Sequence, residues 1–151
     1  MSKDYFDDYA KKLEEMIKKK VKEDYKEYIV DLMYEPKNWG KPLDNEISVS
    51  ESYKGPCGDT MQFFLKINED IILKANFITD GCGASIATAS QVTLLIEGKS
   101  LEFAEDLRPE DIDKALGGLP EDHKHCEELA TTTLKKAIKK YRINREHSCL
   151  W

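Results

Sequence analysis

The chain is organised around the segment Asp80-Gly81-Cys82-Gly83-Ala84-Ser85-Ile86-Ala87, which joins a predicted strand to a predicted helix. The glycines on both sides of Cys82 allow a close backbone approach or unusual dihedral angles. A helix that begins here directs its free N–H groups and the positive end of its dipole at the sulfur, which favours the thiolate. Thiolates are soft ligands that suit zinc, iron–sulfur clusters and transferable sulfur. The segment therefore predicts a metal or sulfur site at this junction.

The stretch before this segment predicts a sheet. Apolar and polar residues alternate over 47–53, 61–67 and 71–77, which is the period of a half-buried strand. The first stretch has a thin apolar face and is expected at the sheet edge, whereas the other two form an antiparallel hairpin around a turn at 68–70. Alternation places Ile71, Leu73, Ala75 and Phe77 on one face of the third strand. The apolar helix over 84–96 covers the sheet and is expected to be buried on more than one side.

Helical patterns occupy both ends of the chain. Apolar residues recur at steps of three and four from 6 to 33, which predicts one long amphipathic helix or two helices with a break near 22–24. Two short helices are expected after Ser100 and from Pro109, the second ending at Gly117. A final helix follows, with the pair His125-Cys126 near its start.

Length and charge exclude several classes of protein. The 151 residues are enough for one domain with a core that needs no staples. A net charge of −6 gives no general footprint for nucleic acid. No apolar run predicts a membrane span or a signal core, so we expect a cytoplasmic protein. The four cysteines then indicate metal or redox chemistry more than disulfides.

Three cysteines are candidate ligands. Cys57 and Asp59 are two residues apart at the start of an extended segment, which points both side chains to one face. Cys82 and Cys126 are each expected at a helix N-terminus, with His125 beside Cys126, so the two dipoles would converge if these helix ends meet. The donor set suits tetrahedral zinc and equally a two-iron cluster with mixed ligands, and the residues leave this choice open.

The spacing of the cysteines is a weak signal by itself. Gaps of 25 and 44 residues separate Cys57 from Cys82 and Cys82 from Cys126, and they match no compact zinc knuckle. A lone cysteine is more often a small buried hydrophobe than a ligand. The flanking residues, read together, argue against that interpretation for these three. Cys149 and His147, near the end of the chain, are assigned no role.

The segments Gly55-Pro56-Cys57-Gly58-Asp59, 80–87 and His125-Cys126 resemble, in this order, the IscU/NifU-type iron–sulfur cluster assembly scaffold family. The similarity runs from about Tyr34 to about Arg145 and includes the loop at 36–40. It implies an α+β fold, in which helices pack on one face of a three-stranded antiparallel sheet. The chain then divides into an N-terminal helical extension (1–33) on or next to the domain, a scaffold domain (34–147) and a tail (148–151).

The resemblance also implies a function. The cluster ligands would be Cys57, Cys82 and Cys126, with Asp59 and His125 beside them. A cysteine desulfurase would deliver sulfur, iron would join it, and a labile [2Fe-2S] cluster would pass to apo iron–sulfur proteins. Free thiolates also bind zinc readily, so a purified sample is expected to acquire it.

Two departures from the family affect partners and ligands. The family commonly has Leu-Pro-Pro-Val-Lys before His-Cys, a motif that a chaperone recognises, and the degraded counterpart here is Leu119-Pro120-Glu121-Asp122-His123. His123 replaces the lysine and is either an additional metal ligand or a plain exposed histidine. The helical extension either packs back on the domain or forms a homo-oligomer interface.

A cluster scaffold of this kind is not expected to be an enzyme. Two alternative functions compete with it. A zinc-binding sulfur acceptor would serve the same desulfurase, but the related sulfur-transfer branch carries an insertion between its second and third cysteines for which the 44-residue gap leaves no room. A module braced by structural zinc would unfold on chelation, whereas a core of this size should survive metal loss.

Overall fold

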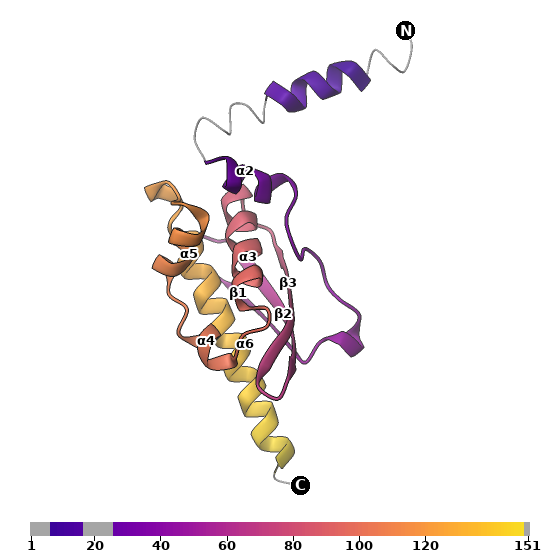
Figure 1. Cartoon of the computed structure of the whole chain (residues 1–151), viewed down its shortest axis with the longest axis vertical. Helices are drawn as coiled ribbons and strands as arrows, with labels where there is room; N and C mark the ends of the chain where they lie inside the picture. Colours follow the sequence, from indigo (N-terminus) through magenta and orange to yellow (C-terminus); the bar gives the residue numbers. More distant parts are fainter. Residues whose placement is uncertain (1–6, 17–25, 150–151) are drawn as a thin grey trace.

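The computed structural model of the chain describes residues 7–16 and 26–149, with the side chains of 147–149 left aside. A helix over 7–16 comes first. The elements that follow are α2 (Glu27–Tyr34), η1 (Asp44–Glu46), β1 (Val49–Lys54), β2 (Thr60–Asn68), β3 (Ile71–Thr79), α3 (Gly83–Ile96), α4 (Leu101–Glu105), α5 (Pro109–Leu116), η2 (Glu121–His123) and α6 (His125–Cys149). The predicted α+β class, with helices on one face of a three-stranded antiparallel sheet, is confirmed (Figure 1).

The sheet is a simple meander in the order β1-β2-β3, with β1 at an edge as predicted. β1 pairs with β2 from Val49↔Leu65 to Lys54↔Thr60. The turn between β2 and β3 places Glu69 at φ 52° and Asp70 at φ 63°. Two consecutive residues at positive φ give the primed turn that matches the twist of a hairpin. The predicted turn at 68–70 is thus confirmed.

A register shift in β3 corrects one part of the sequence interpretation. Lys66 pairs with Lys74 and Ile67 with Ile72, so one extra residue of β3 falls between these two pairs. Such a bulge exchanges the two faces of the strand on either side of it. Ile72 is therefore fully buried, whereas Leu73 is exposed, and the prediction that Leu73 shares the inner face with Phe77 is wrong.

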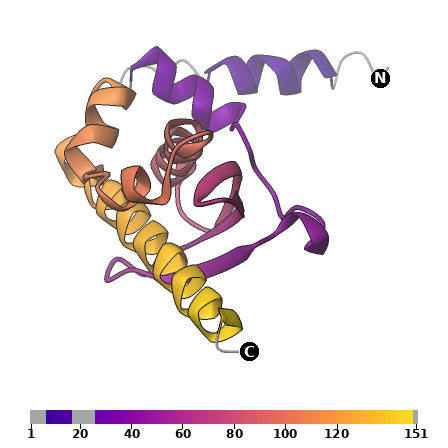
Figure 2. The ribbon, with the colours of Figure 1, turned by 60° about the horizontal axis from the view of Figure 1, so that its bottom comes forward.

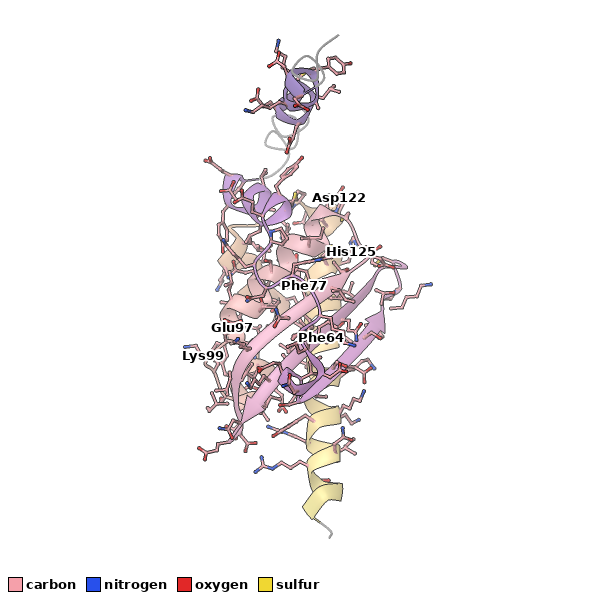
Figure 3. The ribbon with its side chains drawn as sticks, turned by 90° about the vertical axis from the view of Figure 1, so that its right-hand side faces the viewer. Phe64, Phe77, Glu97, Lys99, Asp122 and His125 are labelled. Carbon is pink, nitrogen blue, oxygen red and sulfur yellow. The ribbon has the colours of Figure 1, made fainter. Side chains whose placement is uncertain are left out.

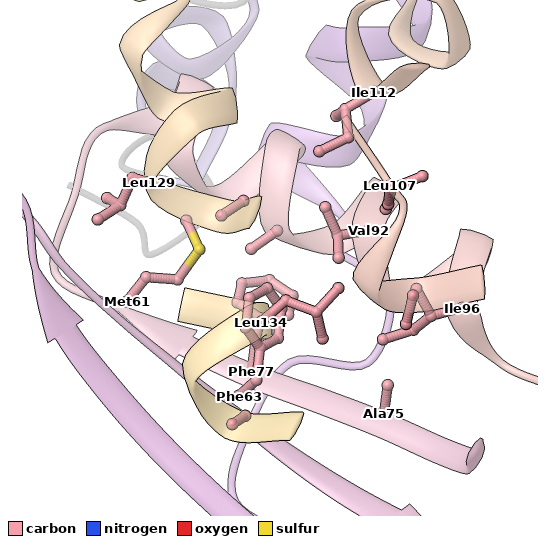
Figure 4. Packing of buried hydrophobic residues seen from close by; sticks show 14 of the residues in the cluster. Met61, Phe63, Ala75, Phe77, Val92, Ile96, Leu107, Ile112, Leu129 and Leu134 are labelled. Carbon is pink, nitrogen blue, oxygen red and sulfur yellow. The ribbon is translucent and has the colours of Figure 1, made fainter. Parts of the chain in front are cut away.

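The inner face of the sheet is covered by α3 and α6, which pack against β3 and β1 respectively. Figure 4 shows Phe63 and Phe77 of the sheet meeting Leu134 of α6. In α3 only Gly83, Ile86, Leu94 and Leu95 are not buried, so the prediction of a helix buried on more than one side is confirmed. This packing fixes the start of α3 and the start of α6 at the same end of the sheet.

The outer face of the sheet is covered by the segment before β1, which includes the short 3₁₀ helix η1. Phe64 lies on this face and is only 2% exposed (Figure 3). It lines a cleft together with Asn38, Pro42 and Glu46, which belong to the segment before β1. The Asn38 amide of this segment donates to Glu97 at the end of α3 at 2.9 Å. The segment before β1 therefore buries Phe64 on a face of the sheet that the alternation predicts to be polar.

The N-terminal region contributes one helix to the core. α2 packs on α3, its Ile29 is fully buried, and the hydroxyl of Tyr28 donates to Gln91 of α3. The predicted break near 22–24 lies outside the described residues. The helix over 7–16 exposes Tyr9, Leu13 and Met16. The division of the chain at residue 33 stays a prediction.

The predicted ends of the short helices are confirmed. Ser100 caps α4 by accepting from the N–H of Phe103 at 3.1 Å, and Pro109 is the first residue of α5. Gly117 ends α5 at φ 89°, a conformation that favours glycine. Within the described residues, no helix has both the length and the apolar character needed to cross a membrane.

Candidate metal centre

Cys57 lies in the loop that joins β1 to β2. The loop is closed by hydrogen bonds from the N–H of Gly55 to the carbonyl of Asp59 and from the N–H of Gly58 to the carbonyl of Gly55. Gly58 has φ 93°, which makes this turn a position for glycine. The prediction that Cys57 and Asp59 lie at the start of an extended segment is wrong, because β2 begins only at Thr60. The side chains still converge, but through a turn.

Cys82 is the N-cap of α3, at the predicted junction with β3. The preceding residues are tied to β2: the N–H of Thr60 donates to the Asp80 carboxylate at 2.7 Å, and the hydroxyl of Thr79 donates to the carbonyl of Thr60 at 2.6 Å. A Cβ on Gly81 would lie 2.5 Å from the Ser85 hydroxyl. The glycine at 81 is thus needed for a close approach rather than for its dihedral angles.

Cys126 lies in the first turn of α6 and is fully buried, whereas Cys57 and Cys82 are exposed. The preceding 3₁₀ helix η2 carries His123, and the N–H of His123 donates to the carbonyl of Pro120 at 2.9 Å. The start of α6 lies beside α5 (Figure 2), and the labelled His125 lies at the end of the sheet in Figure 3. The predicted positions of Cys82 and Cys126 at helix N-termini are confirmed.

All six candidate ligands come together, in two groups of three. The donor atoms of Cys82, His123 and Cys126 lie within 4.8 Å of one another, as do those of Cys57, Asp59 and His125. The Nε2 of His125 lies 3.8 Å from the Sγ of Cys126, so the groups adjoin. The rings of His123 and His125 have centroids 6.3 Å apart. The helix ends of α3 and α6 therefore meet, which is the condition under which their dipoles converge.

The environment of Cys126 favours the protonated thiol. Burial raises the pKa of the Cys126 thiol to about 12, and the nearby Cys82, Asp59 and Cys57 act in the same direction. A hydrogen-bond contact with the Ser85 hydroxyl, at 3.3 Å, acts in the opposite direction and is the smaller effect. The expected bias of a helix N-terminus towards thiolate is thus outweighed at Cys126 by burial. A bound cation would reverse the balance because it replaces the proton.

Comparison with known proteins identifies the family. The family model of the NifU-like N-terminal domain matches residues 24–148. The chain belongs to this family. The family predicted from the three cysteine segments is confirmed, and the match includes every residue of the two ligand groups.

Relatives of this NifU-like chain carry informative names. The iron–sulfur cluster assembly scaffold protein IscU of Aquifex aeolicus (strain VF5) is 38% identical over 120 residues, which is 78% of this chain and 76% of the relative. The protein of the same name in Escherichia coli (strain K12) is 38% identical over 125 residues, covering 81% of this chain and 97% of the relative.

A solved structure agrees on the fold. The crystal structure of a nitrogen-fixing NifU-like protein (N-terminal) from Brucella abortus aligns with a TM-score of 0.60 and 15% identity. The alignment covers 81% of this chain and 96% of that one. At this identity the likeness concerns the fold alone.

Two features of this NifU-like site were missed by the sequence analysis. Ser85 contacts Cys126, and its position three residues after Cys82 on the same helix was the available signal. Glu127 is only 2% exposed, and its carboxyl group is hydrogen-bonded to Asp113 of α5. Burial, followed by this hydrogen bond, raises the pKa of Glu127 to about 8. The signal in the sequence for the Glu127–Asp113 pair was a charged residue, Glu127, directly after Cys126 on the apolar side of α6.

Proposed function

We propose that the chain is a scaffold on which a labile [2Fe-2S] cluster is built from iron and desulfurase-derived sulfur and then passed to apo proteins. The observation that carries the proposal is the convergence of three cysteines, one carboxylate and two histidines at one end of the sheet. Relatives that are 38% identical are named iron–sulfur cluster assembly scaffold proteins, which supports the same role here.

Exposure of the ligands supports assembly rather than storage. Cys57 and Cys82 are exposed, so a partner can reach their sulfurs, whereas Cys126 is buried behind them. Electron-transfer and storage sites favour burial and a complete set of strong ligands. Here the thiolate set is incomplete, and a carboxylate or imidazole supplies the remaining donors. Such a site is suited to release the cluster that it assembles.

The sulfur step follows from the exposed thiols. We propose that a thiolate at Cys57 or Cys82 attacks the outer sulfur of the desulfurase persulfide. A new S–S bond forms on this chain, the S–S bond of the desulfurase breaks, and the desulfurase cysteine leaves as a thiolate. Conversion of the transferred sulfur to the sulfide of a cluster takes two further electrons, which an external reductant supplies.

The proposal also specifies partners and surroundings. A cysteine desulfurase and apo iron–sulfur proteins are the required partners, and the reduced thiols suit the cytoplasm. A chaperone is expected to bind weakly, because Glu121 and Asp122 place two carboxylates in its degraded motif. A homo-oligomer would bury the apolar stripe of Tyr9, Leu13 and Met16 on the helix over 7–16.

Anaerobic reconstitution tests the proposal. Metal-free protein is incubated with ferrous iron, cysteine, a cysteine desulfurase and a thiol reductant, and cluster formation is followed by visible absorption and iron and sulfide analysis. We expect the wild type and Cys149→Ser to form a cluster and Cys82→Ser to fail. If the wild type instead holds only tightly bound zinc and a persulfide, the proposal is wrong and the zinc-binding sulfur acceptor replaces it.

A further inference from the structure

The six candidate ligands form two groups of three rather than one group of four with two further residues beside it. They divide into Cys82–His123–Cys126, the inner trio, and Cys57–Asp59–His125, the outer trio, and within each trio the donor atoms lie within 4.8 Å of one another. Each trio alone offers as many protein ligands as an open zinc or iron site needs. One mononuclear site would use four of the six donors and leave the other two without a function.

We propose that the two trios are separate subsites, so that the chain holds two divalent metal ions side by side before any sulfur arrives, with His123 completing the inner subsite. The proposal deepens the proposed function and rests on it for its biological role. The metal stoichiometry itself does not depend on that role. His123 thereby becomes a ligand specific to this chain's version of the segment before His125.

The charges of the two trios match two divalent cations. Each trio contains two groups that become anionic on metal binding and one neutral imidazole: two thiols in the inner trio, and a thiol and a carboxyl in the outer one. A divalent ion therefore neutralises its own trio. With one ion bound, the thiols of the empty trio keep their protons. With two ions bound, all four anionic groups are balanced, so no uncompensated charge lies next to the fully buried Cys126.

The trios adjoin without sharing a donor. The contact between them is the 3.8 Å separation of His125 Nε2 and Cys126 Sγ, the two residues that follow one another at the start of α6. The first turn of a helix directs consecutive side chains in different directions. His125 can therefore face the loop of Cys57 while Cys126 faces Cys82, and each subsite receives one residue from α6.

The position of His123 follows from the segment that precedes α6. The 3₁₀ helix η2 carries His123 to within 4.8 Å of both inner sulfurs, whereas its neighbour Lys124 extends away to Glu121, at 3.2 Å, and Asp113. The cation at this segment is thus engaged elsewhere, and an imidazole occupies the position beside the inner thiols. This places a neutral donor where a lysine would repel a metal ion.

The donor types make the subsites unequal. The inner trio, with two thiolates, is the softer set and suits zinc, cobalt or ferrous iron. The outer trio, with one thiolate and one carboxylate, is harder and more exposed. We expect the inner subsite to bind more tightly and the outer subsite to exchange its metal faster. Two ferrous ions held in this way, joined by two bridging sulfides, would be a two-iron cluster in its fully reduced state.

Anaerobic titration of metal-free protein with cobalt(II), without desulfurase or sulfide, tests the proposal. Bound metal is counted by equilibrium dialysis with elemental analysis, and the thiolate-to-cobalt charge-transfer bands report the donors. We expect saturation at two cobalt ions per chain, falling to one in His123→Ala, with the bands of a one-thiolate site remaining. Asp59→Ala should also bind one, with the bands of a two-thiolate site. Lys124→Ala, next to His123 but directed away from it, should keep two.

Two results would overturn the proposal. Saturation of the wild type at one cobalt per chain would show a single mononuclear site, and two cobalt ions in His123→Ala would show that His123 is no ligand. Circular dichroism of the metal-free variants shows whether they remain folded; if His123→Ala is unfolded, His123→Gln takes its place and the same outcomes apply. Neither result would affect cluster formation with a desulfurase, so failure here is distinct from failure of the scaffold function.

Discussion

Glu127 makes the stability of the site's supporting helices dependent on pH. The residue is 2% exposed, and its carboxyl group shares a hydrogen bond with Asp113. Asp113 stays ionised as the acceptor, because a hydrogen bond from the Leu119 N–H, at 2.9 Å, holds the pKa of Asp113 below its ordinary value. Lys124 lowers the pKa of Glu127 and Glu110 of α5 raises it, and Lys114 and Glu128 line the same pocket.

The sign of the effect follows from the two states. The pKa of Glu127 is about 8 in the folded protein against an ordinary value of 4.5, so the folded state holds the proton more tightly. The stability that Glu127 contributes is therefore complete below about pH 4.5 and is lost as the pH rises to about 8. A shift of this size corresponds to at most about 5 kcal/mol, and relaxation around the pair reduces the expected loss to about 1–3 kcal/mol.

The substitution Glu127→Gln tests this reasoning. The amide donates to Asp113 without ionising. Between pH 4.5 and pH 8.5 the free energy of unfolding should therefore fall by about 1–3 kcal/mol less in the variant than in the wild type. Urea denaturation with a chelator present measures the pH slopes of both proteins. Glu128→Gln, on the exposed side of the same turn, should behave as the wild type. Equal pH slopes for Glu127→Gln and wild type would refute the argument.

Three further predictions, on Asp59, on the glycines beside Cys82 and on Phe64, can be tested by substitution. Asp59→Ala should slow cluster transfer to an apo acceptor, because it removes the labile oxygen donor and leaves the three thiols; unchanged transfer kinetics would exclude this role. Gly81→Ala should lower the free energy of unfolding by about 1–3 kcal/mol, since its Cβ would lie 2.7 Å from the Cβ of Ser85. In the control Gly83→Ala the new Cβ meets the flexible side chain of Met33, so the cost should be less than about 1 kcal/mol. Equal melting temperatures for the two variants would contradict this. Phe64→Ala should cost about 3–5 kcal/mol in urea denaturation, and a cost below about 1 kcal/mol would show that the outer face of the sheet is not packed.

Local sequence patterns predicted the helices and strands well, whereas features that depend on contacts between distant segments were missed. Alternation and turn residues identified the β2–β3 hairpin, but the bulge that buries Ile72 and exposes Leu73 depends on pairing between strands. Alternation over 61–67 places Phe64 on the polar face of the sheet, and a strand pattern does not reveal which connection will cover that face. Both are consequences of contacts between segments far apart in the chain.

The site shows the same division. The flanking residues of Cys57, Cys82 and Cys126 predicted the family and the helix ends, because glycines and caps are local signals. The convergence of Cys57 and Asp59 was expected, although it arises from a turn and not from a strand. The place of His123 in the inner trio was left open, since it depends on how α6 packs against α3 and how η2 leads into it.

The most direct test of the scaffold role is transfer of a preformed cluster. Reconstituted protein, freed of desulfurase and unbound iron, is mixed anaerobically with an apo ferredoxin and an iron chelator, and the circular dichroism of the two cluster environments is followed with time. The account predicts that the ferredoxin gains its cluster while the chelator gains little iron. If the iron passes to the chelator, or stays on this chain while the ferredoxin remains empty, the chain is not a cluster scaffold.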